Sequence, residues 1–314
     1  MPVQRKVISN KQNKKVLITG GAGFIGKFVK RKLKECGFSV LSIGRKVEED
    51  VSINLSDPKL SQVISDFSPS IVCHFASGSN IARAEENKEK EFKDTVASAL
   101  ALISALSKIK DLKFLYLSSQ AVYGFPEKLP VNEKSPPSPV TEYGKNKLEV
   151  EKIISASNLN YLIFRVSSVY GPTQDYNKSG AIVKFINKLK NNQPPIVFNS
   201  LETFSDYIYI DDIVSAIILF ITCWDKLNIN REIFNLGSGI PVTLKELFEI
   251  LYKFFSKAPK PSTVKNKFYP DELQKGLYLD ISKMESRSKW KPEYSINSGL
   301  QALMDKEFSK AIEF

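Results

Sequence analysis

The first half of the chain alternates short apolar runs with stretches in which apolar residues recur at helical spacing. A short apolar run bounded by turn residues is typical of a buried strand, whereas apolar residues three or four positions apart are typical of an amphipathic helix. The runs predict strands at residues 15–19, 39–43, 71–75, 114–118 and 161–166. The helical spacing predicts helices at residues 24–36, 89–109 and 140–157, with a further amphipathic stretch at 60–64.

This alternation indicates how the elements assemble. Strands joined by helical crossovers form a parallel sheet with helices on both faces, and right-handed crossovers make it doubly wound. After about residue 169, prolines interrupt the pattern. The later segments predict helices at 181–191, 211–222, 244–255 and 298–308, and short strands at 196–198, 233–235 and 277–280.

We therefore expect an α/β protein whose doubly wound sheet occupies residues 15–170, preceded by a loose basic tail at 1–14. Residues 171–314 are expected to form a smaller α/β region that mainly binds substrate. Because no flexible linker separates the two, we expect one compact unit in which some of the later chain crosses back to the first domain.

Composition narrows the class of protein. The 314 residues are 42% hydrophobic and 25% charged, as in a globular chain with a substantial core. No long apolar run occurs and the N-terminus lacks the apolar stretch of a secretory signal, so we expect no membrane span. The cysteines, Cys36, Cys73 and Cys223, are far apart, which predicts neither disulfides nor a metal site and fits a reducing cytoplasm.

The net charge of +11 raises the possibility of nucleic-acid binding. However, Lys and Arg are scattered along the chain without a basic stripe or interleaved aromatic residues, which does not fit a nucleic-acid interface. We interpret the charge as a solvated, lysine-rich surface with a modest attraction for anionic, phosphorylated substrates.

Three glycines follow the first predicted strand and open the first predicted helix. Gly20, Gly23 and Gly26 allow, in turn, a tight turn, close approach of the backbone to a pyrophosphate and close packing of helix on sheet. The helix that begins at Phe24 and Ile25 offers N–H donors and partial positive charge to the phosphates. This strand–turn–helix context predicts a dinucleotide-binding Rossmann fold rather than a purely structural turn.

The end of the second predicted strand bears on which dinucleotide is bound. An acidic residue there would accept hydrogen bonds from the adenosine ribose diol and repel a 2′-phosphate. The sequence instead has Gly44, Arg45 and Lys46. Because Arg45 can pair with a 2′-phosphate, the pattern favours NADP over NAD, with two ordinary surface charges as the alternative interpretation.

A tyrosine and a lysine on the predicted helix at 140–157 are candidates for proton transfer. Tyr143 and Lys147 are four residues apart and therefore share one face of the helix. The lysine ammonium would stabilise the phenolate, lower the pKa of Tyr143 toward the working pH, and bind the nicotinamide ribose. Ser119 ends a predicted parallel strand, where open α/β sheets bind ligands, and would hold the substrate oxygen beside Tyr143.

Together these segments resemble the extended short-chain dehydrogenase/reductase family of nucleotide-sugar epimerases, dehydratases and reductases. The resemblance covers nearly the whole chain and includes later motifs in the family's order. The matching segments are residues 20–26, 73–77, 118–124, 143–147, 165–172, 206–212, 234–239 and 279–283.

The resemblance assigns roles to individual residues. It implies that Tyr143 is the general acid/base, that Lys147 binds ribose and tunes Tyr143, and that Ser119 orients the reacting oxygen. It makes the single histidine, His74, a structural residue near the cofactor pyrophosphate. Further expected cofactor contacts are Asn54, Leu55, Phe75, Ala76, Ser77 and Val166, and further expected substrate contacts are Gln120 and Ser168. The family also implies a nucleotide-sugar substrate and a homodimer formed through the helices at 89–109 and 140–157.

The chain departs from the family pattern at several positions. Asn54 replaces an Asp that contacts adenine, and its amide oxygen can accept the same bond. Ser205 stands where many relatives have an Arg that grips the substrate diphosphate, so a charge-assisted contact is lost. Gln120 and Ala121 replace the Asp-Glu pair of the dehydratases, which argues against elimination of water.

Two hydride-transfer functions remain from the sequence. An NADPH-dependent reductase of a 4-keto-sugar nucleotide is narrowly favoured because of Gly44 and Arg45. An NAD-dependent 4-epimerase, which would return the hydride to the other face of the same sugar, uses the same Ser119, Tyr143 and Lys147. A third alternative is a regulatory protein that binds NAD or NADP without chemistry.

Overall fold

The computed structural model describes residues 14–78, 81–174, 180–198, 200–265 and 276–309, so the predicted tail at 1–14 lies outside the described residues except for Lys14. The chain divides into two compact units. The first comprises Met1–Ser119, Thr141–Arg165 and Val214–Phe234, and the second comprises Gln120–Val140, Val166–Ile213 and Asn235–Phe314. Each unit is therefore built from separate stretches of the sequence.

A seven-stranded sheet forms the centre of the first unit, apart from the last residues of β6 and β10. The strands are β1 (Lys15–Thr19), β2 (Ser39–Gly44), β3 (Val51–Ser52), β4 (Ile71–His74), β5 (Lys113–Ser119), β6 (Asn160–Val166) and β10 (Glu232–Leu236), in the order β10-β6-β5-β4-β1-β2-β3. β1 pairs in parallel with both β2 and β4, so the winding direction reverses beside it. Such a reversal opens the crevice in which doubly wound sheets bind ligands.

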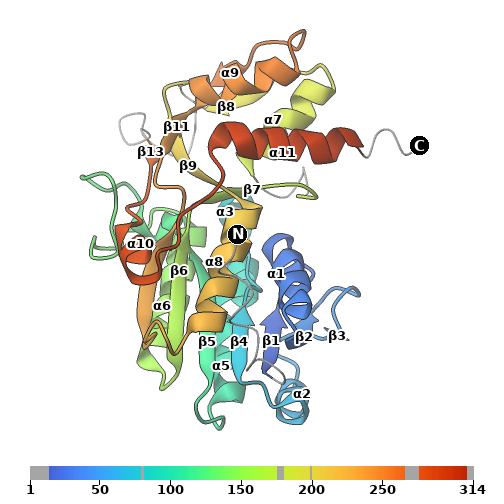
Figure 1. Cartoon of the computed structure of the whole chain (residues 1–314), viewed down its shortest axis with the longest axis vertical. Coiled ribbons are helices and arrows are strands. Elements are labelled where there is room, and N and C mark those ends of the chain that lie inside the picture. Colours follow the sequence, from blue (N-terminus) through green and yellow to red (C-terminus); the bar gives the residue numbers. More distant parts are fainter. Residues whose placement is uncertain (1–13, 79–80, 175–179, 199, 266–275, 310–314) are drawn as a thin grey trace. The chain divides into compact units, whose positions relative to one another are not determined.

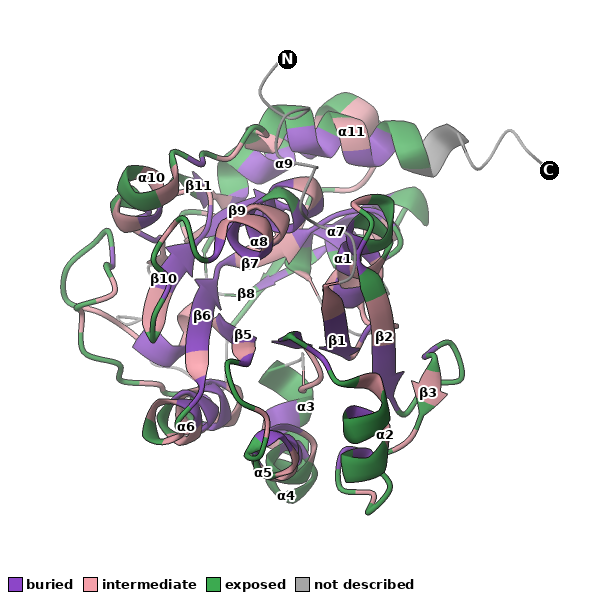
Figure 2. Ribbon diagram, turned by 60° about the horizontal axis from the view of Figure 1, so that its bottom comes forward, coloured by how far each residue is buried: buried purple, intermediate pink, exposed green. Residues whose placement is uncertain are grey.

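Helices cover both faces of this sheet (Figure 1). α1 (Phe24–Glu35) and α8 (Ile210–Cys223) lie on one face, and α2 (Leu60–Phe67), α5 (Ser98–Leu106) and α6 (Glu142–Ala156) lie on the other (Figure 2). The short α3 (Ile81–Glu86) lies between α2 and α5 in the sequence. The predicted fold class, a doubly wound Rossmann fold, is confirmed.

The single helix predicted at 89–109 is divided into three pieces. α4 (Lys88–Phe92) is followed by a π-helical turn, η1 (Lys93–Ala97), and only then by α5. The Ser98 hydroxyl donates to the carbonyls of Asp94 and Thr95, at 2.7 and 3.3 Å, and thus competes with regular backbone pairing. Periodicity of apolar residues alone does not reveal this local change of helix type.

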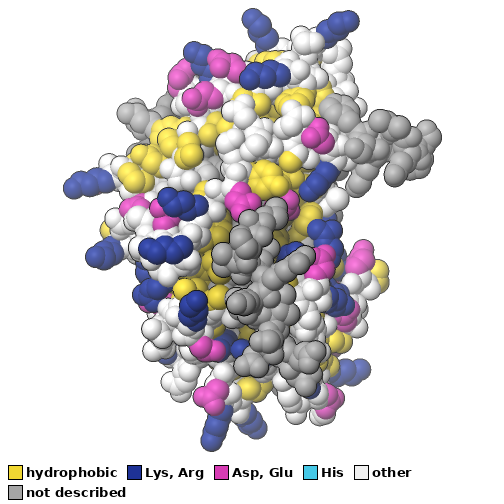
Figure 3. Space-filling model, viewed as in Figure 1, with side chains coloured by type: hydrophobic (Ala, Val, Ile, Leu, Met, Phe, Trp, Pro, Cys, Tyr) yellow, Lys and Arg dark blue, Asp and Glu magenta, His cyan; other side chains and the backbone are white. Residues whose placement is uncertain are grey.

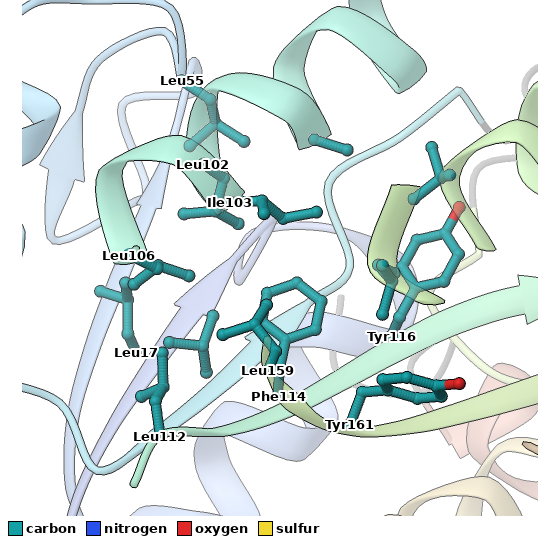
Figure 4. Packing of buried hydrophobic residues seen from close by; sticks show 14 of the residues in the cluster. Leu17, Leu55, Leu102, Ile103, Leu106, Leu112, Phe114, Tyr116, Leu159 and Tyr161 are labelled. Carbon is teal, nitrogen blue, oxygen red and sulfur yellow. The ribbon is translucent and has the colours of Figure 1, made fainter. Parts of the chain in front are cut away.

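The core under α5 consists of side chains from both layers of the first unit (Figure 4). Leu102, Ile103 and Leu106 of α5 lie against Leu17 of β1 and Phe114 of β5, and all five side chains are buried. This packing holds the sheet and the helices in position relative to one another. It thereby also positions the ends of β4 and β5.

The second unit contains two smaller sheets. β7 (Ser168–Tyr170), β11 (Pro241–Thr243) and β13 (Gly276–Leu277) each pair with β9 (Phe204–Tyr209), while β8 (Ile196–Phe198) pairs with β12 (Ser262–Val264). Its helices are α7 (Ala181–Lys190), α9 (Leu244–Phe254), α10 (Ser282–Ser288) and α11 (Ile296–Ser309), with a short η2 (Gln120–Tyr123). β9 has no counterpart among the predicted strands because Ser205 and Asp206 interrupt its apolar pattern.

Asp206 is nevertheless fully buried, and its carboxylate joins three segments of the second unit. It accepts hydrogen bonds from the backbone N–H groups of Ser238 (2.8 Å), Gly239 (3.1 Å) and Leu279 (3.3 Å). Burial raises the pKa of Asp206, and these hydrogen bonds oppose that rise. The carboxylate therefore serves as a local structural tie rather than as an exposed catalytic acid.

The surface shows no concentration of positive charge on the visible face. Lys and Arg side chains are spread over that face among Asp and Glu (Figure 3). None of the helices in the described part of the chain combines the length and apolar character needed to cross a bilayer. Within the same residues, no group of three or more His, Cys, Asp or Glu side chains gathers as a metal site.

Leu106→Ala should lower the free energy of unfolding by about 2–5 kcal/mol, because it opens a cavity beneath α5. Leu106 is fully buried, whereas Val47 is 86% exposed. Val47→Ala should therefore change the stability by less than about 0.5 kcal/mol. Urea denaturation of both variants measures the difference, and equal effects would contradict the packing described for α5.

Candidate active site

The three predicted catalytic side chains lie together in the first unit. Ser119 ends β5, and its side chain is hydrogen-bonded to that of Tyr143 on α6. Lys147 is one turn further along α6 and is only 3% exposed. Its Nζ donates to Ser77 Oγ and to the carbonyl oxygen of Leu117, each at 2.8 Å.

The start of α6 is fixed by its own sequence. Thr141 caps the helix, because its Oγ1 accepts a hydrogen bond from the N–H of Gly144 at 3.0 Å. Glu142 occupies the first turn, where a negative charge stabilises the helix dipole. The cap determines where the helix begins and hence where Tyr143 faces Ser119.

Burial dominates the protonation of this pair. It raises the pKa of Tyr143 to about 12, against the lowering effect of the Ser119 hydrogen bond. It lowers the pKa of Lys147 to about 8, against the raising effects of Glu91 and Glu151. For Tyr143 burial thus outweighs the Ser119 hydrogen bond, and the expectation that Lys147 lowers the pKa of Tyr143 stays a prediction.

A buried ion pair lies next to Ser118, the residue that precedes Ser119. Arg165 Nη2 lies 2.7 Å from Glu151 Oε2, and both side chains are 4% exposed. The Ser118 hydroxyl donates to the other carboxylate oxygen, Glu151 Oε1, at 2.5 Å. Ser118 therefore satisfies a structural partner, while the next residue, Ser119, faces Tyr143.

The glycine loop has the close contacts that its sequence predicts. The N–H of Gly20 donates to the carbonyl of Ile43 at 2.9 Å, and the N–H of Gly23 donates to the carbonyl of Gly20 at 3.0 Å. A Cβ at Gly26 would overlap the Gly20 carbonyl oxygen, so the third glycine permits the helix to approach the turn. Phe24 and Ile25 occupy the first turn of α1, as expected for a phosphate-binding helix terminus.

Glu49 lies beside the glycine loop, and the sequence interpretation missed it. Its side chain is 8% exposed and returns to the end of β2, where Oε1 accepts a hydrogen bond from the N–H of Ala22 in the glycine loop at 2.8 Å. The carboxylate lies between Gly21 and Gly44. Its other oxygen, Oε2, is buried without a hydrogen-bond partner among the described residues.

Neighbouring contacts hold Glu49 in this position. The N–H of Glu49 donates to the carbonyl of Lys46 and closes a turn after β2. The next residue, Asp50, accepts a hydrogen bond from the N–H of Ser42 at 2.8 Å and forms an ion pair with Lys30 of α1 at 2.9 Å. The acid is therefore five residues beyond the strand end, and only a search past the turn would have found it in the sequence.

The two cations after β2 have other partners. Arg45 forms a two-bond contact with Asp94, with Nη1–Oδ1 and Nη2–Oδ2 distances of 2.7 and 3.1 Å. Lys46 Nζ donates to the carbonyl of Ala22 at 3.2 Å. The guanidinium that was predicted to bind a 2′-phosphate is thus paired with a carboxylate.

The other predicted cofactor residues fall into three groups. Phe75, Ala76 and Ser77 follow β4, where the N–H of Phe75 donates to the carbonyl of Thr19 at 3.0 Å. Asn54 accepts a local bond from the N–H of Ser56, and the Leu55 side chain joins the hydrophobic core. Val166 is buried at the end of β6 and belongs to the second unit. Their contacts with a cofactor stay predictions.

His74 is fully buried, and its expected place near the cofactor pyrophosphate stays a prediction. Its Nδ1 lies 2.7 Å from Thr19 Oγ1, and its ring stacks on Tyr116 with centroids 5.5 Å apart. Burial, with a smaller effect of Lys147, lowers the pKa of His74 to about 3. The imidazole is therefore neutral at physiological pH.

The predicted substrate residues outside the first unit form a neutral row in the second. Gln120 Nε2 donates to Ser168 Oγ at 3.4 Å, and Ser168 Oγ lies 3.1 Å from Ser205 Oγ. Gln120 Oε1 is buried and has no hydrogen-bond partner among the described residues. Ser168, an expected substrate contact, thus lies against Ser205, which departs from the family pattern.

Comparisons with known proteins agree with this fold. Residues 16–237 match the family model described as the NAD dependent epimerase/dehydratase family. The chain therefore belongs to this family of extended short-chain dehydrogenase/reductase enzymes, and the family resemblance predicted from the sequence is confirmed.

Among its relatives, a protein of Methanocaldococcus jannaschii that is provisionally named a UDP-glucose 4-epimerase is 32% identical, covering 92% of this chain and 97% of the relative. A dTDP-4-dehydro-6-deoxyglucose reductase of Escherichia coli is 28% identical, covering 92% and 96%. The crystal structure of a UDP-glucose 4-epimerase from Thermotoga maritima with UDP-glucose matches with a TM-score of 0.84 and 25% identity, covering 95% of this chain and 99% of that one.

Gly26→Ala should weaken dinucleotide binding by about tenfold or more, because the new methyl group displaces the turn at Gly20. Titration with NAD, followed by fluorescence or calorimetry, measures the affinity. Gly37→Ala is the matched control, since it strains the end of α1 at positive φ but meets no atom within 4 Å. It should cost stability while leaving the NAD affinity near that of the parent; an equal loss in both variants would argue against a local effect at the loop.

Proposed function

We propose that this enzyme is an NAD-dependent nucleotide-sugar 4-epimerase. The observation that carries the choice of cofactor is the Glu49 carboxylate beside the glycine loop. A carboxylate accepts hydrogen bonds from the ribose diol of NAD and repels the 2′-phosphate of NADP. This proposal replaces the sequence-based preference for NADP, which depended on Arg45.

The residues present fit NAD. The glycine loop and the start of α1 would hold the diphosphate, and the unpartnered Glu49 Oε2 would accept a bond from the adenosine ribose. Lys147, with its remaining donor capacity, would hold the nicotinamide ribose. When bound, NAD supplies an acceptor that takes a hydride from the sugar and later returns it.

The chain's own residues handle the accompanying proton. Tyr143 takes the proton of the C4 hydroxyl as the C4 hydrogen leaves with its electron pair, and later gives the proton back to the alkoxide. Ser119 holds the reacting oxygen beside the Tyr143 hydroxyl. Lys147 keeps a positive charge near the phenolate, which lowers the free energy of the ionised form.

The relatives support return of the hydride to the same sugar. The M. jannaschii and T. maritima proteins carry the 4-epimerase name, whereas the E. coli relative is a reductase. A 4-keto-sugar reductase remains the second candidate on that relationship, and it would need an exchangeable reduced cofactor. A homodimer through α5 and α6 stays a prediction, supported by the exposed Leu100 on α5, whose side chain is 54% accessible.

Purified protein should convert UDP-glucose to its C4 epimer without added cofactor, and Tyr143→Phe should reduce kcat by about 10²–10⁴-fold with NAD affinity almost unchanged. The lost phenol removes proton transfer but little binding area. Tyr161→Phe is the control, because Tyr161 lies on β6 and its hydroxyl contacts Ser155 instead. Turnover only with added NADPH and a 4-keto sugar would favour the reductase.

Glu49→Gln should shift the cofactor preference toward NADP by about tenfold or more relative to the parent, because it removes the negative charge that opposes the 2′-phosphate. The ratio of the two dissociation constants is the measurement. Glu48→Gln removes a charge from the adjacent, exposed side chain and should leave the ratio in place. A parent that binds NADP as tightly as NAD would refute the role given to Glu49.

A further inference from the structure

Glu91, on α4, is a buried carboxylate that the proposed proton transfer does not use. Its side chain is 7% exposed. It lies directly against the backbone of Gly78, where an added Cβ would overlap both carboxylate oxygens. The glycine therefore leaves the space that the acid fills, just beyond the end of β4.

Hydrogen bonds connect Glu91 to the segment that holds Lys147. Thr95 Oγ1 donates to Glu91 Oε1 at 3.0 Å and accepts from the N–H of Gly78 at 2.9 Å. The residue before Gly78 is Ser77, whose hydroxyl accepts from Lys147 Nζ. Ser77 thus binds the ammonium directly, and Gly78 is linked to the carboxylate through Thr95.

The π-helical turn contributes to this placement. η1 begins two residues after Glu91 and contains Thr95 at its centre. A π turn inserts an extra residue and rotates the preceding helix relative to the following one, and such turns occur frequently at functional sites. Here both polar residues, Glu91 and Thr95, are buried, while α5 presents an apolar face to the core.

The titratable side chains around Lys147 come from four elements, namely β4, β5, α4 and α6. The rings of Tyr116 on β5 and Tyr143 on α6 lie 5.0 and 5.7 Å from Nζ. His74 on β4 is neutral, and Glu151 on α6 is paired with Arg165. Glu91 makes no ion pair within 4 Å among the described residues, so its charge is not neutralised by a direct contact of this kind.

The electrostatic effects agree with this geometry. Burial lowers the pKa of Lys147, and Glu91 is the first group that opposes the decrease. Glu91 also raises the pKa of Tyr143. Burial raises the pKa of Glu91 itself, with the Thr95 hydrogen bond and Lys147 acting in the opposite direction and Asp94 adding to the rise.

We propose that Glu91 is a positioning residue for the Tyr143–Lys147 pair: its buried carboxylate supplies the negative charge that keeps Lys147 an ammonium inside the site. This role deepens the proposed function and depends on Tyr143 and Lys147 carrying the proton transfer. Glu91 acts through its charge on both Lys147 and Tyr143 and sets the pH range in which the pair works, without contacting the reacting atoms.

The test is the pH dependence of kcat in Glu91→Gln. Loss of the negative charge lowers the pKa of both Tyr143 and Lys147. Activity requires an ionised Tyr143 together with a charged Lys147, so the two limbs of the profile follow the two pKa values of this coupled pair. Both limbs should therefore move to lower pH by about one unit. Glu91→Asp keeps the charge and should keep both limbs near the parent's positions.

The test also includes a control variant and a second variant of Glu91. Glu149→Gln removes an exposed carboxylate from α6, where Glu149 is paired with Lys152, and should move neither limb. If Glu91→Gln does not fold, Glu91→Met offers an apolar side chain of similar length with the same expected shift. A lower maximal kcat with both limbs unmoved would overturn the proposal, as would equal shifts in the Asp and Gln variants.

Tyrosinate absorption separates this inference from the proposed function. The difference between the parent and Tyr143→Phe in a spectroscopic pH titration reports the ionisation of Tyr143 without any turnover. A shift of this ionisation to lower pH in Glu91→Gln supports the role of Glu91 even if the parent epimerises no nucleotide sugar. An unmoved ionisation in an active enzyme overturns the role of Glu91 and leaves the epimerase proposal standing.

Discussion

One positive charge must be kept on Lys147, a side chain that is only 3% exposed. Burying an ammonium costs several kcal/mol unless hydrogen bonds and negative charge compensate for lost hydration. The compensation comes from the hydroxyl of Ser77, the carbonyl of Leu117 and the carboxylates of Glu91 and Glu151. These groups belong to the ends of β4 and β5, to α4 and to α6. The site therefore forms only when the sheet and the helices of the first unit are packed together.

The sequence predicted the parts of this arrangement that depend on local spacing. Ser119, Tyr143 and Lys147 were singled out because a strand end and an i, i+4 pair on a helix can be recognised from the chain, and the family resemblance then implied their roles. Glu91 was not found, since its importance arises from contacts with Gly78 and Thr95 across two elements. A signal existed: Glu91 and Thr95 fall on the same helix face, in a segment whose next turns are apolar. Periodicity predicted a continuous helix there and gave no indication of the π turn.

The cofactor illustrates the difference between local pattern and tertiary contact. At the end of β2 the sequence offers Arg45 and no acid, which is the pattern of an NADP site. In the fold, Arg45 is paired with Asp94, while Glu49 reaches back over a turn to the same strand end. What the cofactor would meet depends on that turn, which Asp50 anchors to Ser42 through hydrogen bonds. A sequence pattern that considers only fixed positions after the strand does not include Glu49.

The second unit raises a complementary question about how a sugar would be held. Gln120, Ser168 and Ser205 carry no charge, and each can both donate and accept hydrogen bonds. An arginine in the place of Ser205 would bring a charge-assisted bond to a diphosphate and would also leave a cation beside Ser168. The two serine hydroxyls instead form a hydrogen bond in which either can be the donor. Because Gln120 Nε2 donates to Ser168 Oγ, the direction of the bond between the serines depends on Gln120. Such a row would adapt to hydroxyl groups at modest energetic cost. In the proposed function, discrimination between sugars would then depend on hydrogen-bond geometry rather than on a fixed charge.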